Sequence, residues 1–483
     1  MSVHSIVIGV LLVLCALTLL THAQWAALDF DEGYNMQIPL HLAQTGSYAT
    51  YDQVHDPKIT TGWPVLAAAA LLINTESPDV SVRYVTLVYS VLLILLVGVF
   101  LLKTTAQRMV FLAGTFVVPL FYLFATSLLG EIPALTLTVA ALILWSRKHY
   151  FVAGILMAMA VMTKQTYALV VVAMLIEAVI SQVKYSKPMA RQTGWIPFIG
   201  AFLCMHGLWA LYQMVTVGSF ANYLQLVNAA ADWARSQTSP RPDLIQSKLH
   251  MISQILHIDS TILLGMSTLA AYQSLRMWAT YTIRVLSILM VGWMIYILTL
   301  GATAWYRHLF PPLSILLIVM AHHVQYLKGA SINSKYILLL ILPVALSIQS
   351  LVFHNPLDHF AYLTRAQNLL FLDHRNRPYL RPKQILLHQQ QAASFIKSIP
   401  HAQVIAGLGW YNTPQLAYLA NRRISRDPTR ADYVIVDIYA RYLNEQGVED
   451  FMKKYPFKSL VFENPSYAIY MTSQVSSCRL TEE

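Results

Sequence analysis

Three carboxylates stand close together near the start of the chain, in the stretch "ALDFDEGYN". Asp29, Asp31 and Glu32 directly follow the first apolar segment, which places them at the surface of a membrane that this segment crosses. Two neighbouring carboxylates in a cavity suit general-base catalysis or binding of a divalent cation, because their repulsion raises the proton affinity of one of them. A solvated acidic helix cap has the same sequence, so both interpretations stay open.

Further ionisable residues lie at the ends of other apolar segments. Glu131 begins one in "LLGEIPAL", Lys164 lies in a short turn in "AVMTKQTY", and Arg307 with His308 begins another in "WYRHLFPP". A charge in a bilayer costs about 2.5–3.5 kcal/mol at a helix centre, so charges near one are functional candidates, and cations there suit phosphate. The alternatives are a capping acid for Glu131, a snorkelling Lys164 and an interfacial Arg307 beside an aromatic belt.

The composition indicates that these residues are positioned by membrane helices. Of 483 residues, 56% are hydrophobic and only 12% are charged, and the mean hydropathy of +0.51 is outside the usual soluble range. Apolar runs of about 20 residues recur, which predicts an α-helical polytopic membrane protein with about eleven spans. We expect the spans near 5–25, 82–102, 109–127, 132–146, 150–166, 168–183, 195–217, 259–275, 280–301, 308–326 and 336–353.

The charges of the short loops predict the orientation of the chain. With a cytoplasmic N-terminus, almost all loop cations lie inside: Lys103, Arg108, Arg147, Lys148, Lys184, Lys187, Arg191, Arg276, Lys328 and Lys335. The short outer loops then hold few cations apart from Lys164 and Arg307, as the positive-inside rule requires. The first segment is expected to stay as an uncleaved anchor. An odd number of spans puts the C-terminal tail outside. We expect a multi-pass protein of the plasma (inner) membrane.

Two regions of the chain do not span the membrane. An outer loop at about 28–79 holds the acidic cluster and the apolar run "GWPVLAAAALL", and a further outer loop follows at about 218–258. From residue 354 onward, short apolar strands alternate with a helix that begins at a Thr, which predicts a small α/β domain outside the membrane. The expected domains are therefore 1–353 and 354–483. The chain has no basic, aromatic-rich stripe, so no nucleic-acid partner is expected.

The order of these motifs resembles the GT-C glycosyltransferases, most closely the protein O-mannosyltransferase and lipid A aminoarabinose transferase branch. The shared features are an uncleaved first span, an Asp-Glu pair opening the first outer loop, "GWP" before the second span, an acid in the second outer loop, "TK" between later spans and "RH…P" before a late span. The resemblance covers the first two hundred residues and the Arg307 segment. The chain lacks the "KPP" of the aminoarabinose branch, since Lys58 and Pro64 are separated, and it lacks the "WWDYG" of oligosaccharyltransferases.

The resemblance implies that a sugar on a polyprenyl phosphate is transferred outside the membrane with inversion to a glycan, lipid or protein acceptor. The site residues that it implies are Asp31 as the catalytic acidic residue, Glu32 as its neighbour, Glu131 as the acid of the second loop, Lys164 and Arg307 with His308 on the donor phosphate, and Tyr34, Lys58 and Trp63 as candidate substrate contacts. No cofactor is certain. If a divalent metal takes part, Asp31 and Glu131 are its expected ligands.

Two other functions remain as alternatives. For a lipid or sugar transporter we expect charges near mid-bilayer and paired repeats in the two halves, and we recognise neither in the sequence. A polysaccharide polymerase or ligase also has many spans and a large outer loop, but its donor is a pyrophosphate-linked glycan.

Overall fold

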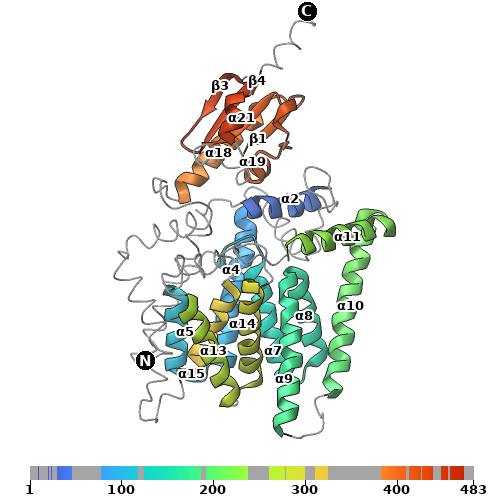
Figure 1. The fold of residues 1–483 in the computed structure, drawn as a ribbon, viewed down its shortest axis with the longest axis vertical. Coiled ribbons are helices and arrows are strands. Elements are labelled where there is room, and N and C mark those ends of the chain that lie inside the picture. Colours follow the sequence, from blue (N-terminus) through green and yellow to red (C-terminus); the bar gives the residue numbers. More distant parts are fainter. Residues whose placement is uncertain are drawn as a thin grey trace, which may run out of the picture. The chain divides into compact units, whose positions relative to one another are not determined.

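The structure, a computed structural model, divides into two compact units (Figure 1). It describes residues 30–45, 78–117, 125–185, 192–237, 260–277, 279–299, 310–324, 382–408, 413–425, 427–438, 448–454 and 457–472, with Gly9, Val13, Leu20 and Ala23. The helical unit holds the described residues from 82 to 324 together with Gly9, Val13, Leu20 and Ala23, and the α/β unit holds the described residues within 30–45, 78–81 and 382–472. The helix of the first outer loop thus groups with the C-terminal residues.

The helical unit contains no strand in its described part. Its elements are α4 (Pro78–Leu96, which begins in the α/β unit), η2 (Val97–Leu101), α5 (Thr105–Val117), α7 (Glu131–Ser146), α8 (Tyr150–Thr163), η3 (Gln165–Ala168), α9 (Leu169–Tyr185), α10 (Gln192–Val217), α11 (Phe220–Gln237), α13 (Ser260–Arg276), α14 (Tyr281–Thr299) and α15 (Phe310–His323). Helix α11 lies in the first part of the region expected as a polar outer loop at about 218–258, because its apolar positions recur at helical spacing.

Three described helical stretches are long and apolar enough to cross a membrane: Val80–Leu101, Gln165–Val183 and Gly194–Val217. Four shorter apolar helices accompany them: Glu131–Ser146, Tyr150–Thr163, Tyr281–Ile297 and Phe310–His323. The expected count of about eleven spans is therefore not reached by the described residues. The expected span near 336–353 lies outside them, as does the first span apart from four single residues.

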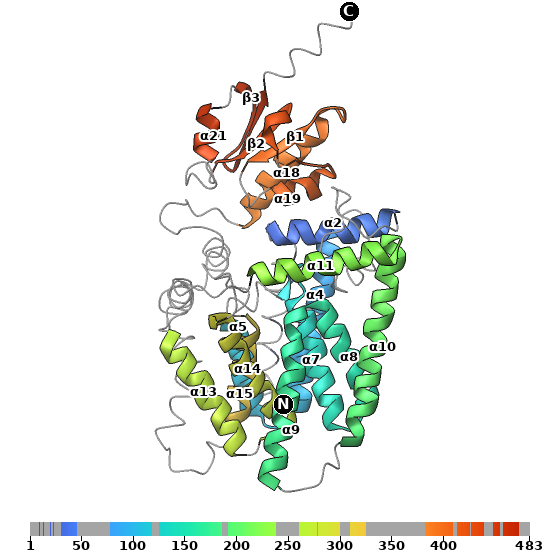
Figure 2. The ribbon, with the colours of Figure 1, turned by 45° about the vertical axis from the view of Figure 1, so that its right-hand side comes forward.

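Close helix packing builds the core of the helical unit, as between α8 and α10, which lie side by side (Figure 2). A Cβ atom added to Gly154 would lie 2.3 Å from the carbonyl oxygen of Phe198, so the two backbones touch there. The ring of Trp145 lies 4.7 Å from that of Trp195 and 5.0 Å from that of Phe198, measured between centroids. Small residues at a crossing with large rings beside it are typical of packed membrane helices.

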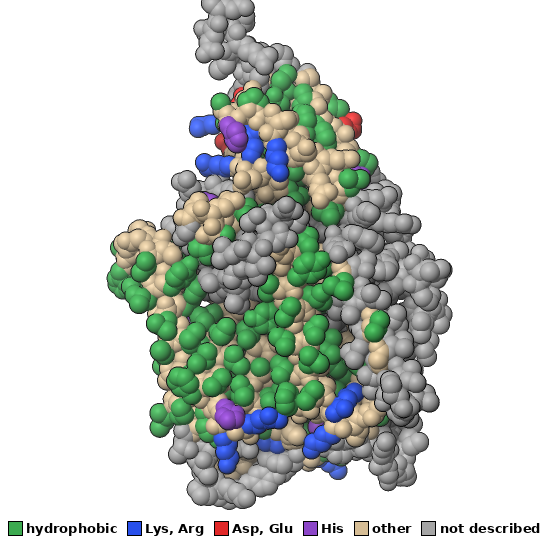
Figure 3. Space-filling view, turned by 180° about the vertical axis from the view of Figure 1, so that it is seen from behind, with side chains coloured by type: hydrophobic (Ala, Val, Ile, Leu, Met, Phe, Trp, Pro, Cys, Tyr) green, Lys and Arg blue, Asp and Glu red, His purple; other side chains and the backbone are tan. Residues whose placement is uncertain are grey.

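Apolar side chains cover the face of the helical unit that Figure 3 shows, and Lys and Arg side chains gather at one end of it. Exposed apolar residues include Val88, Val172 and Leu203. Described cations lie in the connections from α4 to α5 (Lys103) and from α7 to α8 (Arg147 and Lys148). An apolar surface with cations at one end is what lipid-facing helices with a positive side require. Which side of the membrane this end faces stays a prediction.

The α/β unit contains the small sheet that the tail sequence predicts. Its elements are α2 (Phe30–Thr45), α18 (Pro382–Ser398), β1 (Ile405–Leu408), α19 (Thr413–Ala420), η7 (Pro428–Arg430), β2 (Tyr433–Asp437), α21 (Val448–Lys454), β3 (Phe457–Glu463) and β4 (Tyr467–Thr472). The strand order is β1-β2-β4-β3, with β1 and β2 parallel and β4 antiparallel to both of its neighbours. The Asn464 carboxamide accepts hydrogen bonds from the N–H groups of Ser466 and Tyr467, which closes the β3–β4 hairpin.

Alternating residues of β2 face two different layers. Ile435 packs with Leu416 of α19 and Ile396 of α18 in one buried cluster, while Val434 and Val436 belong to a second cluster. This is the period of two expected of a strand that is covered on both faces. Helix α19 is thereby fixed to the sheet by its apolar side.

Arg422 ties the end of α19 to the end of α18. Its guanidinium donates to the carbonyl oxygens of Ile396 (3.0 Å), Pro400 (3.1 Å), Gln403 (3.3 Å) and Ile399. Burial lowers the pKa of Arg422 from its ordinary value, yet a guanidinium stays charged at neutral pH. A cation on the last carbonyls of a helix also interacts favourably with the helix dipole.

Candidate active site

Glu131 and Lys164, which the sequence analysis singled out separately, form an ion pair in the helical unit. The Lys164 Nζ atom lies 2.6 Å from Glu131 Oε1, and the side chains are 25% and 3% exposed, respectively. Charge-assisted contacts of this length are among the strong hydrogen bonds. The pair therefore presents a partly accessible ammonium group that is anchored on a buried carboxylate.

The local backbone explains how both residues reach this position. Gly130 precedes α7 in the left-handed conformation, with φ of 81°, which glycine adopts without a steric penalty. Lys164 is extended, with φ of −148° and ψ of 107°, and separates α8 from η3. Glu131 thus begins α7, and Lys164 is the extended residue between α8 and η3.

A row of polar side chains on α4 holds the segment 125–131 that leads to Glu131. Arg83 Nη1 donates to the carbonyl oxygen of Thr126 (3.2 Å), Thr86 Oγ1 to that of Ser127 (2.9 Å) and Ser90 Oγ to that of Ala125 (2.9 Å). These three residues follow each other at three- and four-residue spacing, so they share one face of the helix. The segment is therefore bound through its backbone, and the carboxylate of Glu131 is preorganised.

The same segment also contacts Lys164 and Tyr167. Lys164 Nζ lies 3.5 Å from the carbonyl oxygen of Leu129, and the hydroxyl group of Tyr167 donates to the carbonyl oxygen of Glu131 at 3.2 Å. Tyr167 is completely buried. The acid and the cation are thus parts of one hydrogen-bonded cluster.

Two members of this cluster were not predicted from the sequence. Arg83 is 1% exposed and lies within an expected span. Its charge in "SVRYV" could have marked it as a candidate, but only the cations in loops were considered. Tyr167 follows Lys164 by one turn of a 3-10 helix, a spacing that has no signal in a hydropathy pattern.

The acidic pair of the first loop belongs to the other unit. Asp31 and Glu32 lie in the first turn of α2, and Glu32 is buried. Tyr34 is in the same helix. The candidates Lys58, Trp63, Arg307 and His308 lie outside the described residues. Within the described ranges, no three His, Cys, Asp or Glu side chains gather as a metal ion requires.

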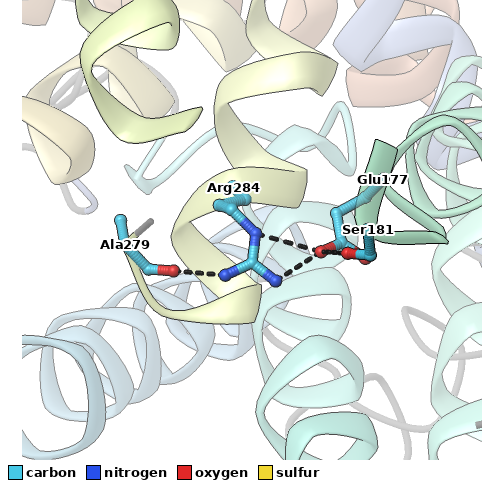
Figure 4. Close-up of polar contacts among 4 residues, drawn as sticks. All are labelled: Glu177, Ser181, Ala279 and Arg284. Carbon is cyan, nitrogen blue, oxygen red and sulfur yellow. Dashed lines mark hydrogen bonds and ion pairs between the residues drawn. The ribbon is translucent and has the colours of Figure 1, made fainter. Parts of the chain in front are cut away.

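A second buried ion pair joins α9 to α14 in the helical unit (Figure 4). The Glu177 Oε1 atom accepts from Arg284 Nε at 3.0 Å, from Arg284 Nη2 and from Ser181 Oγ at 2.7 Å, and Arg284 Nη1 donates to the carbonyl oxygen of Ala279. The Glu177 side chain is 2% exposed and that of Arg284 is 5% exposed.

This pair bears on the transporter alternative, for which charges near mid-bilayer and paired repeats in the two halves are expected. No such charges were recognised in the sequence, although Glu177 and Arg284 both lie inside expected spans. Each neutralises the other, and neighbouring groups complete their hydrogen bonds, so the pair has the character of a structural contact between two helices.

Two solved proteins with a similar fold, ArnT and an archaeal oligosaccharyltransferase, are members of the GT-C superfamily. ArnT from Cupriavidus metallidurans, a lipid A aminoarabinose transferase, matches in complex with undecaprenyl phosphate with a TM-score of 0.59 and 9% identity, over 96% of this chain and 97% of that chain. In the apo state it matches with a TM-score of 0.56 and 9% identity, over 97% and 98%. The apo oligosaccharyltransferase from Archaeoglobus fulgidus matches with a TM-score of 0.51 and 12% identity, over 98% of this chain and 74% of that chain.

The similarity to ArnT extends over nearly the whole chain, including the tail. The sequence motifs shared with GT-C proteins did not cover the tail. At this level of identity it establishes the fold, and the expected resemblance to GT-C proteins is confirmed at that level. No model of a known protein family matches the chain, and no curated protein sequence matches it.

Proposed function

We propose that this chain, which has the GT-C fold, is a membrane glycosyltransferase that takes a monosaccharide from a polyprenyl-phosphate carrier. The acceptor is a glycan, a lipid or a protein, and the transfer takes place at the outer surface of the membrane with inversion. The observation that carries the proposal is the Lys164 ammonium group, partly accessible and anchored 2.6 Å from buried Glu131 at the junction of apolar helices. That ArnT has been solved with undecaprenyl phosphate supports a lipid carrier of the same class.

The leaving group of this reaction is a lipid phosphate. As an anion it needs no proton to depart, only stabilisation of its developing charge, which a fixed cation in a poorly hydrated site provides. Lys164 supplies that cation in our proposal, and Arg307 with His308 adds further donors. Because Glu131 is already bound to an ammonium group, it is a poor ligand for a divalent cation, which that ammonium would repel. The proposed reaction therefore includes no step at a metal ion.

The acceptor hydroxyl group, in contrast, has to lose a proton. Asp31 is the proposed base, and Glu32 is its neighbour in the first turn of α2. Attack on the anomeric carbon from the side opposite the phosphate inverts that carbon. Tyr34, Lys58 and Trp63 are proposed to contact the substrates in the first outer loop.

A transfer assay tests the proposed function. The purified protein in nanodiscs is given undecaprenyl-phosphate monosaccharides or undecaprenyl-pyrophosphate glycans together with an acceptor extract, and mass spectrometry follows the lipid products. We expect release of undecaprenyl phosphate from a monosaccharide donor. Consumption of the pyrophosphate donor alone would indicate a polymerase or ligase instead. In a parallel experiment with the protein reconstituted into closed vesicles, movement of an intact donor across the membrane without consumption would indicate a transporter.

The Lys164→Gln variant tests the proposed contact with the donor phosphate. Losing one charge-assisted hydrogen bond, about 1.5–3 kcal/mol, should weaken the binding of the lipid-linked sugar by roughly 10–150-fold. Titration of the donor into nanodiscs measures the affinity, and thermal unfolding checks that the helices stay folded. Lys148→Gln, at the turn between α7 and α8, is the matched control. Donor affinity equal to that of the parent would favour the snorkelling interpretation of Lys164.

A further inference from the structure

We propose that the α/β unit is part of the catalytic apparatus, because its helix α19 holds α2 and thereby positions the acidic residues Asp31 and Glu32. The residue that permits this docking is Gly33, which we infer to be a positioning residue. The inference rests on the proposed function, in which Asp31 is the base.

The backbones of α2 and α19 touch at Gly33. A Cβ atom added there would lie 2.6 Å from the Cα and N atoms of Gln415 and 2.9 Å from the carbonyl carbon of Pro414. These are backbone atoms in the first turn of α19, so no side-chain rotation relieves the overlap. Glycine is therefore the residue that fits this point of contact.

A polar contact one turn further along α2 fixes the same face. Gln37 is four residues after Gly33, so both lie on one side of the helix. Gln37 Nε2 donates to the carbonyl oxygen of Pro414 at 3.4 Å, and both Gln37 and Gln415 are buried. The steric contact and the hydrogen bond together define which face of α2 meets α19.

Helix α19 is itself anchored to the sheet. Its residues Leu416, Ala417 and Ala420 belong to the buried cluster that includes Ile435 of β2, and Arg422 just beyond its end is bound to α18. One side of α19 thus packs on the sheet while its first turn contacts α2. The sheet, α19 and α2 form a continuous packed unit.

Helix α2 depends on this support because its own sequence favours helix poorly. It has 16 residues with Pro39 in its interior and Gly33 in its first turns. Proline removes a backbone hydrogen bond of the helix, glycine is a poor helix former, and most of the stability of a helix in a protein comes from tertiary packing. Packing on α19 therefore determines both the conformation of α2 and the place of the carboxylates next to Gly33.

Gly33→Ala is the variant that separates positioning from helix propensity. Alanine is the better helix former, so a loss in this variant must come from the steric overlap with α19. We expect kcat to fall by about 10–100-fold, as for a small misplacement of a reacting group, with the KM for the lipid-linked donor unchanged. Gly207→Ala in α10 is the matched control, because nothing lies within 4 Å of an added Cβ there.

Combining Gly33→Ala with Asp31→Asn tests whether Gly33 acts through Asp31. If it does, the double variant is no slower than Asp31→Asn alone, because the base that Gly33 positions is already absent. A loss in the double variant equal to the product of the two single losses would overturn the inference. So would a Gly33→Ala enzyme that transfers sugar at the parent rate.

Hydrogen exchange tests the docking without any activity measurement. In the full-length protein we expect the amides of residues 30–45 to be protected, and to exchange about tenfold faster or more in Gly33→Ala while α10 is unchanged. Equal exchange of α2 in parent and variant would overturn the inference. A parent that consumes no lipid-linked donor overturns the proposed function, and the exchange result then still decides whether α19 holds α2.

Discussion

Asp31→Asn should lower turnover by about a hundredfold or more while the lipid-linked donor still binds with nearly its original affinity. The substitution keeps the size of the side chain and removes its ability to accept a proton from the acceptor hydroxyl group. The departing phosphate is served by other residues in our proposal, so donor binding does not depend on Asp31. Single-turnover transfer rates and donor titration, performed on the same preparation, separate the two quantities.

Asp450→Asn provides the matched control for this experiment, since Asp450 is an exposed residue of α21 and undergoes the same chemical change. Its turnover should equal that of the parent. A folded Asp31→Asn protein that transfers sugar at a near-normal rate would show that the base lies elsewhere. Glu32, the buried neighbour, would then be the next residue to test.

Breaking the Glu177–Arg284 pair should produce the largest change in stability. Glu177→Gln or Arg284→Gln leaves one charge buried without its counter-ion, which lowers the free energy of unfolding by about 3–5 kcal/mol. The double variant Glu177→Leu/Arg284→Met removes both charges and should lose far less. Unfolding in mixed detergent micelles, followed by circular dichroism, measures each difference.

Ser181→Ala serves as the graded control, because it removes a single hydrogen bond to Glu177, worth about 1 kcal/mol. If both single variants unfold like the parent, the pair is dispensable for stability. That result would support the alternative of a transporter in which the two charges bind the transported molecule. Loss of donor transport across vesicles in those stable variants would support it directly.

Much of the helical unit could be predicted from hydropathy. The segments expected near 132–146, 150–166, 168–183 and 195–217 coincide with α7, α8, α9 and α10 to within a few residues. Average hydropathy over about 20 residues finds such segments well because lipid imposes their length. The same averaging hides single charges: Glu177 and Arg284 barely change the mean of their windows, and their pairing across 107 residues has no local signature.

The candidate site was predictable in part. Glu131 and Lys164 stood out because each is an isolated charge at the end of an apolar segment, and the structure brings them together. The roles assigned to them, and to Asp31 and Arg307, stay predictions. Gly33 was not predictable, because its constraint comes from the backbone of Gln415, which no pattern around residue 33 reveals.

The contact between α2 and α19 also has a consequence for how the protein is made. Gln37 and Pro414 are separated by 377 residues along the chain. At roughly 5–20 residues per second, the ribosome needs about 20–75 s to produce the second after the first. During that interval α2 exists without its docking partner while the helices between them are inserted. Assembly of the acidic loop is therefore a late event in biogenesis, and a chain that stalls before residue 413 has its membrane helices but not the support for its proposed base.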